Sequence, residues 1–485
     1  MQPRPPAFFA CVLAAAVQLA VWCSGSLSPT AVAAGPVHTG LMNGSSLDDA
    51  TYSRIRGAGA SYVKIGLRWA DVAPERPARP ADPDDPAYDW SHFDAEVNLA
   101  LGHGLVPIAM VYAAPRWAMD EANWARPNAT ELGLFARAAA LRYSSPVPAD
   151  PVDDPYLGAL AGVRHWQVWN EPNLTYYLRG EREEDRLLSP ATYRSMVNNF
   201  ADAVHAVDPP SVVIAGGTGP FAHRKNTAPL LFMRELLCLR DDLTAKPDCG
   251  PVRFDVWGHH PYTYGGPTHH AKRADDVSLG DLRKMGRVLR AAVREGTIES
   301  SWPVPFWVDE FSWDSSPPDP KGIPSALHAR WVSEALYRMW KARVSLVVWQ
   351  QLVDTNWTGR CGSPYQSGLY FHAFDPARAR PKRALTAFRF PFVAFRRHGR
   401  ISIWGRTPWS EPGSVTVERR SAFGWRRVAT LLTDEHGIFS RRYRRPWRRG
   451  SLRARFGAAR SVPFSLAPVR DRFFNPFGMR RIGCG

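Results

Sequence analysis

The sequence predicts an α/β protein, a (β/α)₈ barrel followed by a small antiparallel β-sandwich domain. Apolar, β-rich runs alternate with helical patterns over residues 35–394, as is typical of parallel strands joined by helices. Two of these runs end in a glutamate with aromatic neighbours, which suits a fold that brings strand ends together. Over residues 395–485 the pattern changes to short alternating runs separated by turns, which favours a β-sandwich.

The predicted barrel strands span residues 38–42, 62–69, 105–112, 163–170, 212–217, 254–260, 305–310 and 346–351. Helical patterns between them include residues 129–143, 190–207, 279–294 and 325–341. Such alternating units in one region of this length suit a single barrel with insertions. An open doubly wound sheet is the alternative, but no glycine-rich phosphate loop follows the first strand, so a nucleotide-binding fold is disfavoured.

Residues 1–34 have the pattern of a secretory signal peptide. Arg4 supplies the charged start, residues 7–22 are mostly apolar, and small residues that suit cleavage follow at 31–34. The apolar run is short for a membrane-spanning helix, although an uncleaved anchor is the alternative. We therefore expect a secreted, extracellular protein without a transmembrane segment in the mature chain.

Export makes disulfide bonds possible. Two of the six cysteines would leave with the signal peptide. Cys238 and Cys249 flank a short polar segment and are expected to pair, which leaves Cys361 and Cys484 as a second pair by elimination. None of the cysteines has the spacing of metal ligands, and His259, His269 and His270 lack the carboxylates that would complete a site. No metal and no cofactor are therefore predicted.

The positive charge of the chain is concentrated in its C-terminal region. From Arg396 onward there are 21 arginines, no lysine and five acidic residues, so this region alone accounts for the formal net charge of +16. Such a surface could contact an anionic polymer of the cell envelope. The preferred interpretation is an arginine-rich β domain whose charges are solvated. No nucleic-acid recognition motif is present, so nucleic acid is not an expected partner.

Two strands carry the candidate chemistry. The first runs from His165 into Trp169-Asn170-Glu171-Pro172, where proline ends the strand. The second runs from Pro305 to Glu310. In a (β/α)₈ barrel the carboxyl ends of the strands meet on one face, so both glutamates would line one site. A pair of carboxylates across a glycosidic bond is the equipment of glycoside hydrolysis.

The stretch Trp-Asn-Glu-Pro-Asn at 169–173 resembles the acid/base signature of the clan A glycoside hydrolases, which are retaining (β/α)₈ enzymes. The order of the motifs along the chain leaves two families open, the cellulase-like family 5 and the xylosidase-like family 39. The resemblance implies that Glu171 is the acid/base and Glu310 the nucleophile. It implies that Asn170 binds the sugar 2-hydroxyl. Asp309 is expected to point away from the site, because side chains alternate along a strand.

Further residues are assigned through the same resemblance. In the segment Trp257–Tyr262, His260 would line the cleft and Tyr262 would hydrogen-bond the nucleophile. Trp349, at the end of the eighth predicted strand, would lie under the sugar. The clan usually has an arginine within the second strand. Here Lys64 stands at that place and Arg68 lies four residues further along the same face, so either could supply the positive charge.

These residues predict a secreted retaining glycosidase that cleaves a β-linked poly- or oligosaccharide by double displacement. A transglycosylase is a near alternative, since it differs only in whether water or a sugar resolves the intermediate. A non-catalytic envelope protein that binds glycans through a retired barrel is an alternative of another class. An adhesion protein that works through its basic domain is a third, and it predicts salt-sensitive binding of anionic polymers.

Overall fold

The computed structural model describes residues 35–43, 46–120, 123–144, 162–179, 182–183, 186–222, 225–300, 303–358, 365–397, 399–444, 447, 449–469 and 472–477. The predicted signal peptide and both members of the predicted pair Cys361–Cys484 lie outside these residues. None of the helices in the described ranges is both long and apolar enough to cross a membrane.

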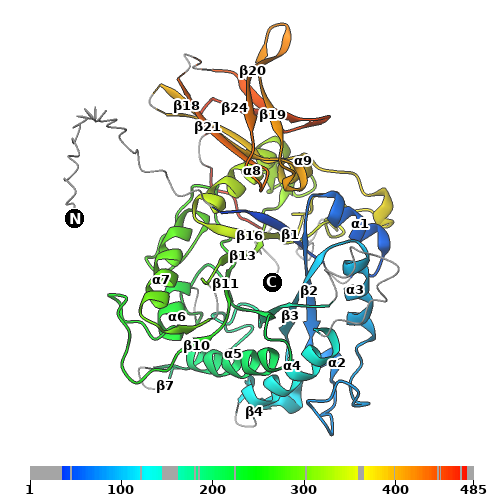
Figure 1. Cartoon of the computed structure of the whole chain (residues 1–485), viewed down its shortest axis with the longest axis vertical. Helices are drawn as coiled ribbons and strands as arrows, with labels where there is room; N and C mark the ends of the chain where they lie inside the picture. Colours follow the sequence, from blue (N-terminus) through cyan, green and yellow to red (C-terminus); the bar gives the residue numbers. More distant parts are fainter. Residues whose placement is uncertain are drawn as a thin grey trace, which may run out of the picture. The chain divides into compact units, whose positions relative to one another are not determined.

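Eight parallel strands close into a barrel, in the spatial order β1, β16, β13, β11, β9, β6, β3 and β2 (Figure 1). Their bounds are β1 (His38–Met42), β2 (Tyr62–Arg68), β3 (Val106–Tyr112), β6 (His165–Val168), β9 (Val212–Thr218), β11 (Val256–His259), β13 (Phe306–Phe311) and β16 (Val344–Trp349). Each predicted barrel strand has a counterpart here, and the predicted barrel is confirmed. The strand expected over 163–170 is shortened most, since β6 covers only His165–Val168 and ends before Trp169.

Helices surround the ring of strands, as Figure 1 shows. They are α1 (Asp49–Gly57), α2 (Trp69–Val72), α3 (Ser91–Gly102), α4 (Ala129–Tyr143), α5 (Leu188–Val207), α6 (Pro229–Leu236), α7 (Leu282–Arg294), α8 (Ser325–Lys341) and α9 (Arg383–Arg389). Short 3₁₀ turns are η1 (Arg116–Ala118), η3 (Leu279–Asp281), η4 (Pro376–Arg378) and η5 (Pro408–Ser410). Short strand pairs outside the barrel are β4 (Met119–Asp120) with β5 (Asn123–Pro127), β7 (Arg182–Glu183) with β8 (Arg186–Leu187), β10 (Val252–Arg253) with β12 (Ile298–Glu299), and β14 (Ser315–Ser316) with β15 (Ile323–Pro324).

The helix α4 illustrates how local sequence sets these elements. Asn128 precedes it, and its side-chain oxygen accepts hydrogen bonds from the backbone N–H groups of Thr130 and Glu131 at 2.9 and 3.1 Å. This N-cap satisfies donors that the first helical turn leaves unpaired. On its inner face Leu132 and Phe135 are buried in the core. The strand β3 is buried at its five central positions, as expected where helices cover one face and barrel interior the other.

The C-terminal region forms two antiparallel sheets, which confirms the predicted change of architecture. One contains β17 (Phe392–Arg397), β18 (Arg400–Arg406) and β21 (Ile438–Arg444). The other contains β19 (Ser414–Ser421), β20 (Gly424–Leu432), β22 (Ser451–Phe456), β23 (Ala459–Arg460) and β24 (Phe464–Ser465). The first strand of this region, β17, begins at Phe392, slightly before the expected boundary at residue 395.

Buried contacts join these sheets to the barrel. The Arg406 side chain is buried, and its guanidinium donates to the carbonyl of Val37 at 2.6 Å and to the hydroxyl of Thr39 at 3.2 Å. The Trp404 ring packs against Tyr337 of α8, with ring centroids 5.5 Å apart. Because a buried guanidinium needs such partners, the contact indicates a fixed interface rather than a loose tether.

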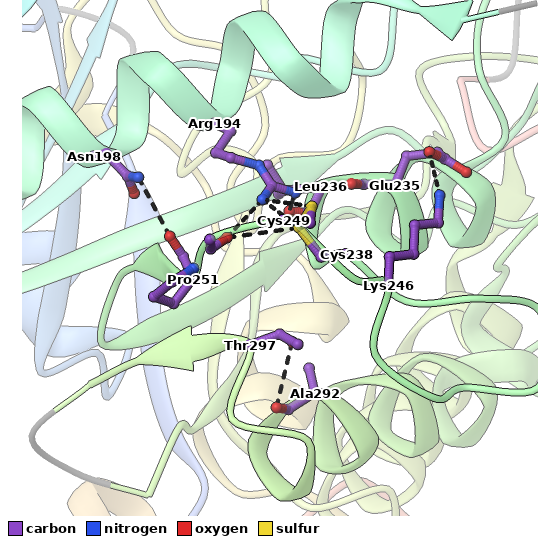
Figure 2. The surroundings of a disulfide bond; sticks show 11 residues. Arg194, Asn198, Glu235, Leu236, Cys238, Lys246, Cys249, Pro251, Ala292 and Thr297 are labelled. Atoms are coloured by element: carbon purple, nitrogen blue, oxygen red, sulfur yellow. Dashed lines mark hydrogen bonds and ion pairs between the residues drawn. A yellow bond between two sulfur atoms is a disulfide. The ribbon is translucent and has the colours of Figure 1, made fainter.

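The expected disulfide between Cys238 and Cys249 is present, with Cα atoms 5.9 Å apart. Figure 2 shows that the Arg194 side chain of α5 lies against it. The Arg194 guanidinium donates to the carbonyls of Gly250 at 2.8 Å and Glu235 at 3.0 Å. The disulfide and Arg194 therefore hold the loop after α6 to the helix α5.

Candidate active site

The candidate site lies where β6, β11 and β13 end, on the face that carries active sites in (β/α)₈ barrels. Glu171 follows β6, His260 and Tyr262 follow β11, and Glu310 is the fifth residue of β13. These strands are close neighbours in the barrel, with β9 between β6 and β11. The structure therefore brings together the glutamates that lie far apart in the sequence.

Glu171 is held in an unusual backbone conformation. Its φ is 40°, and φ of Trp169 is 68°, so both residues lie in the left-handed region that non-glycine residues rarely adopt. The Glu171 N–H donates to the carbonyl of Gly217 at 3.1 Å, and the Trp169 N–H donates to the carbonyl of Val111 at 2.8 Å. Such strained residues persist only where surrounding contacts fix them, and they gather at functional sites.

His260 lies between the two glutamates. Its Nδ1 atom is 3.0 Å from Oε1 of Glu171 and 3.9 Å from Oε2 of Glu310. These two carboxylate oxygens can be no further apart than the sum of those distances. Retaining glycosidases hold their carboxyl groups about 5–5.5 Å apart, whereas inverting enzymes hold them about 6.5–9.5 Å apart. The bound is compatible with the separation that retention needs.

Tyr262 contacts the second glutamate directly. Its hydroxyl donates to Oε1 of Glu310 at 2.8 Å, and the side-chain amide of Gln350 lies 3.0 Å from the same hydroxyl. Burial, together with the charge of Glu310, raises the pKa of Tyr262 well above its usual value. The hydroxyl therefore keeps its proton and remains a donor to the carboxylate.

Asp309 takes part in the site, so the expectation that it points away is wrong. Its side chain is buried, and Oδ2 lies 3.3 Å from Nε2 of His260 and 3.5 Å from Nζ of Lys64. Lys64 also donates to the backbone carbonyl of Asp309 at 3.1 Å. Trp307 and Asp309 share the inner face of the strand, which the prediction gave to Glu310.

The charges of this cluster set its protonation states. Burial raises the pKa of Glu171, and the Glu310 carboxylate adds to the shift, while the hydrogen bond and charge of His260 oppose it. Burial alone would lower the pKa of His260, but the charges of Glu310 and Asp309 outweigh it and raise that pKa to about 10. Although burial opposes it, the charges of His260 and Lys64 hold the pKa of Asp309 far below its usual range.

The protonation of Glu171 follows from this balance. His260 and Lys64 supply two positive charges, and the other two carboxylates supply two negative ones. The cluster is then electrically neutral when Glu171 carries its proton. A proton held on one carboxyl beside an ionised partner is the arrangement that acid catalysis by a carboxylic acid requires.

The other predicted site residues near the glutamates, Asn170, Arg68 and Lys64, differ from one another in burial and in partners. Asn170 is 6% exposed, and its side-chain oxygen has no hydrogen-bond partner within the described part of the chain. Asn170 is not among the residues that line the cavity described below, so its predicted contact with the sugar stays a prediction. Arg68 lies at the rim, half exposed and paired with Asp71, whereas Lys64 lies inside. Lys64 is therefore the cation that reaches the carboxylates.

Trp349 lies in the core rather than in the wall of the cavity. It is 2% exposed, its indole N–H donates to the carbonyl of Ser367 at 2.8 Å, and its ring packs near Phe311 and Phe388. Trp349 is not among the residues that line the cavity described below, so its expected contact with a sugar is not seen there. Trp349 instead supports β13, which carries Glu310.

A cavity of about 670 Å³ opens beside the two glutamates. The residues that line it include Glu171, Glu310 and Tyr262. Its walls come from the loops after β6, β9, β11 and β16, and from the last described residues of the chain. Its volume is within the range of about 300–1,000 Å³ that is usual for small-molecule sites.

The histidines that might suggest a metal site have other partners. His259 is buried between the hydroxyl of Thr218 and the carbonyl of Val277, at 2.8 and 3.1 Å. His270 lies 2.9 Å from Asp281. Over the described ranges of the chain, no group of three or more histidine, cysteine or acidic side chains could hold a metal ion.

No protein-family model and no curated protein matches the chain. Solved structures resemble it over most of its length. A family 39 glycoside hydrolase from the gut symbiont Bacteroides cellulosilyticus WH2 is 14% identical, with a TM-score of 0.49 over 84% of this chain and 79% of that chain. A family 39 enzyme from Xanthomonas axonopodis pv. citri is 14% identical, with a TM-score of 0.47 over 88% and 92% of the two chains.

A monomeric beta-xylosidase from Caulobacter crescentus CB15 is 17% identical, with a TM-score of 0.47 over 85% of this chain and 95% of that chain. Two of these neighbours are named as family 39 enzymes, and family 39 is one of the two families that the sequence motifs left open. At these identities the likeness concerns the fold, and one fold supports many activities. The functional argument therefore rests on the geometry of the site.

Proposed function

We propose that this protein is a retaining glycoside hydrolase in which Glu310 is the nucleophile and Glu171 the acid/base. One observation carries the proposal: both carboxylates contact the same Nδ1 atom of His260, at 3.0 and 3.9 Å, and both line one cavity. Two carboxylates held by one imidazole are compatible with the separation that double displacement needs. Sugars also suit the aromatic side chains of the cavity wall.

In the first step Glu310 attacks the anomeric carbon while Glu171 gives its proton to the departing oxygen. The glycosidic bond breaks, and a glycosyl ester forms on Glu310. Tyr262 directs the attacking carboxylate, because its hydroxyl donates to Oε1 and leaves Oε2, which lies 3.9 Å from Nδ1 of His260, to attack. The raised pKa of Glu171 keeps the proton in place until it is needed.

In the second step Glu171, now ionised, removes a proton from water, and the water oxygen attacks the same anomeric carbon. The ester bond to Glu310 breaks, and the carboxylate is restored. With Glu310 and Asp309 ionised, their charges raise the pKa of His260 to about 10, so the histidine is charged when Glu310 attacks. Two inversions at one carbon give net retention of configuration.

The substrate class that we propose is a β-linked poly- or oligosaccharide, and the proposed location is outside the cell. The leader-like sequence of residues 1–34 supports export. The disulfide between Cys238 and Cys249 also suits an oxidising compartment. A role for the basic C-terminal domain in holding an anionic envelope polymer remains a separate proposal that salt-dependent binding would test.

The proposal is tested by sugar release from xylans, β-glucans, mannans and aryl β-glycosides. Wild-type protein is compared with Glu310→Gln, and Glu435→Gln, whose side chain is 85% exposed, serves as a matched control. We expect release by the wild type and the control, and a loss of at least about a thousandfold in Glu310→Gln. Equal release by all three proteins would contradict the assignment of Glu310.

Two other results would point to the alternatives. Longer oligosaccharide products, formed at the expense of free sugar, would identify a transglycosylase that uses the same two glutamates. Binding of a glycan without any release would favour a retired barrel. The intact charge network around Glu171 and Glu310 speaks against that second alternative.

A further inference from the structure

The last described residues of the chain return to the candidate site. We call residues 472–477 the tail segment. The Gly265 N–H donates to the carbonyl of Phe474 at 2.9 Å, and the Asp314 N–H donates to the carbonyl of Pro476 at 2.8 Å. Gly265 follows β11 and Asp314 follows β13, so the segment is pinned to the two loops next to Glu310.

Gly265 allows this close approach. Its φ is 117°, in the region that favours glycine, and an added Cβ would lie 3.2 Å from the carbonyl oxygen of Arg472. The loop after β11 therefore has the backbone that docking of the tail segment requires.

Two of the three phenylalanines in the tail segment serve as anchors. Phe474 packs edge-on against Trp331 of α8, with centroids 5.7 Å apart. Phe477 packs against Tyr262, with centroids 4.6 Å apart, and so touches the residue that holds Glu310. Both rings are partly buried and packed against the hydrophobic core.

The third phenylalanine is different. Phe473 is 71% exposed, yet its ring is stacked on Tyr264 at 5.5 Å with an angle of 8° between the ring planes. Tyr264 in turn stacks on Phe221 at 5.2 Å and 21°. Three nearly parallel rings from three separate segments thus form one stack, and all three belong to the wall of the cavity. A single exposed aromatic is ordinary, but an aligned stack in a cavity wall suits a flat ligand.

The stack lies in the same cavity as the two glutamates. Around the barrel the loops after β9 and β11 lie between Glu171, which follows β6, and Glu310, which belongs to β13. Phe221 and Tyr264 belong to these two loops, and both line the cavity together with Phe473. A saccharide bound at the glutamates therefore places its neighbouring sugars along this wall.

We infer that the tail segment completes the substrate cleft, and that Phe473 forms a platform for a sugar next to the one that is bound at the two glutamates. This inference rests on the proposed glycosidase function and adds a specificity-determining residue to it. The C-terminal region would then have a part in selecting the substrate, because its last described residues reach the cavity. A free apolar ring face suits the apolar face of a pyranose ring.

The test compares Phe473→Ala with Phe473→Tyr, which keeps a stacking ring, in the full-length protein. Phe423→Ala is the matched control, since Phe423 is 88% exposed in the turn between β19 and β20, outside the cavity wall. Each protein is assayed on tetrasaccharides of xylose, glucose and mannose, and on the corresponding glycosyl fluorides. A glycosyl fluoride of a single sugar fills only the position at the two glutamates, so it reports on them alone.

We expect Phe473→Ala to lower kcat/KM for the cleaved tetrasaccharide about tenfold, mainly through KM, and to leave the fluoride rate within about twofold. Phe473→Tyr and Phe423→Ala should behave as the wild type. Unchanged tetrasaccharide kinetics in Phe473→Ala would overturn the inference. An equal loss on both kinds of substrate would also overturn it, since that result would mean general damage to the site.

A binding measurement separates this inference from the proposed function. Dissociation constants of the same three tetrasaccharides are measured by calorimetry in Glu310→Gln, with and without Phe473→Ala. Weaker binding by about tenfold in the double variant would support the platform even if the wild type cleaves none of the sugars. Absence of binding to all three, or equal binding by the two variants, would refute it.

Discussion

His260 Nδ1 lies 3.0 Å from Oε1 of Glu171, while the other ring nitrogen of His260 lies 3.3 Å from Asp309. One buried imidazolium therefore connects the candidate acid/base to Asp309, a carboxylate that is not among the residues lining the cavity. Because Asp309 and Glu310 keep His260 positively charged, the histidine stabilises Glu171 in its ionised form as well as orienting it.

Glu171→Gln should remove acid/base catalysis while leaving the nucleophile in place. We expect kcat/KM to fall by about 10²–10⁴-fold on substrates with poor leaving groups such as sugars. The loss on the first step should be much smaller for a glycosyl fluoride, because fluoride needs less protonation to depart. Steady-state and burst kinetics on both substrates check this. An equal loss in the first step on both would show that Glu171 has another role.

The basic limb of the pH profile of kcat/KM should report the loss of the Glu171 proton. Burial raises the pKa of Glu171 above 4.5, so activity should persist above the ordinary glutamate range and fall as pH rises through the raised value. The charge of Lys64 lowers this pKa. Lys64→Met should therefore move the basic limb to higher pH, whereas Lys64→Arg, which keeps the charge, should leave it near the wild-type position.

Lys64→Met should also destabilise the fold by about 3–5 kcal/mol, since it breaks a buried ion pair. Chemical denaturation measures this cost. A basic limb that moves to lower pH in the methionine variant would contradict the electrostatic argument, whatever the change in stability.

Tyr262→Phe should lower kcat with little effect on the fold. The variant removes the hydroxyl that donates to Glu310 but keeps the ring that packs against Phe477. A hydrogen bond to a charged group contributes about 1.5–3 kcal/mol, which corresponds to about ten- to hundredfold in rate. Single-turnover kinetics and thermal melting check both parts. Unchanged formation of the glycosyl ester would show that this hydrogen bond does not serve the attacking carboxylate.

Cys361 and Cys484 should form a second disulfide. The rings of Tyr365 and Phe477, residues near these cysteines in the sequence, have centroids 5.7 Å apart. Non-reducing peptide mapping should therefore yield a linked pair that contains both cysteines. The Cys238–Cys249 pair provides the internal control in the same digest. Free thiols at both positions alongside an intact control pair would contradict this prediction.

The barrel was predictable from sequence because each strand is a separate apolar run. Each end of β3, β9 and β13 lies within one residue of the predicted end. The end of β6 was less predictable, because the left-handed backbone at Trp169 and Glu171 depends on hydrogen bonds to strands that are distant in sequence. Periodicity carries no signal for such contacts.

The candidate site was predictable where a motif marks it and not where only tertiary contacts define it. Motifs identified Glu171, Glu310, His260 and Tyr262. Asp309 was missed because the prediction gave the inner face of the strand to Glu310, whereas Trp307 and Asp309 share that face and Asp309 reaches His260. Trp349 fits its motif position, but its hydrogen bond to Ser367 holds it in the core.

The tail segment could not have been predicted from local sequence. The short run Phe473–Phe474 resembles any apolar stretch, and its partners Gly265, Asp314 and Tyr264 lie more than a hundred residues earlier. Three phenylalanines after the last strand were the available signal that the chain docks again.

The most direct test of the account is to trap the covalent intermediate. The protein is treated with a 2-deoxy-2-fluoroglycosyl fluoride of the sugar that it cleaves, digested, and mapped by mass spectrometry. The account predicts one glycosyl group per protein, attached to Glu310, together with retained configuration in the product of the unmodified reaction. A label on Asp309 or Glu171, or an inverted product without any label, would contradict it.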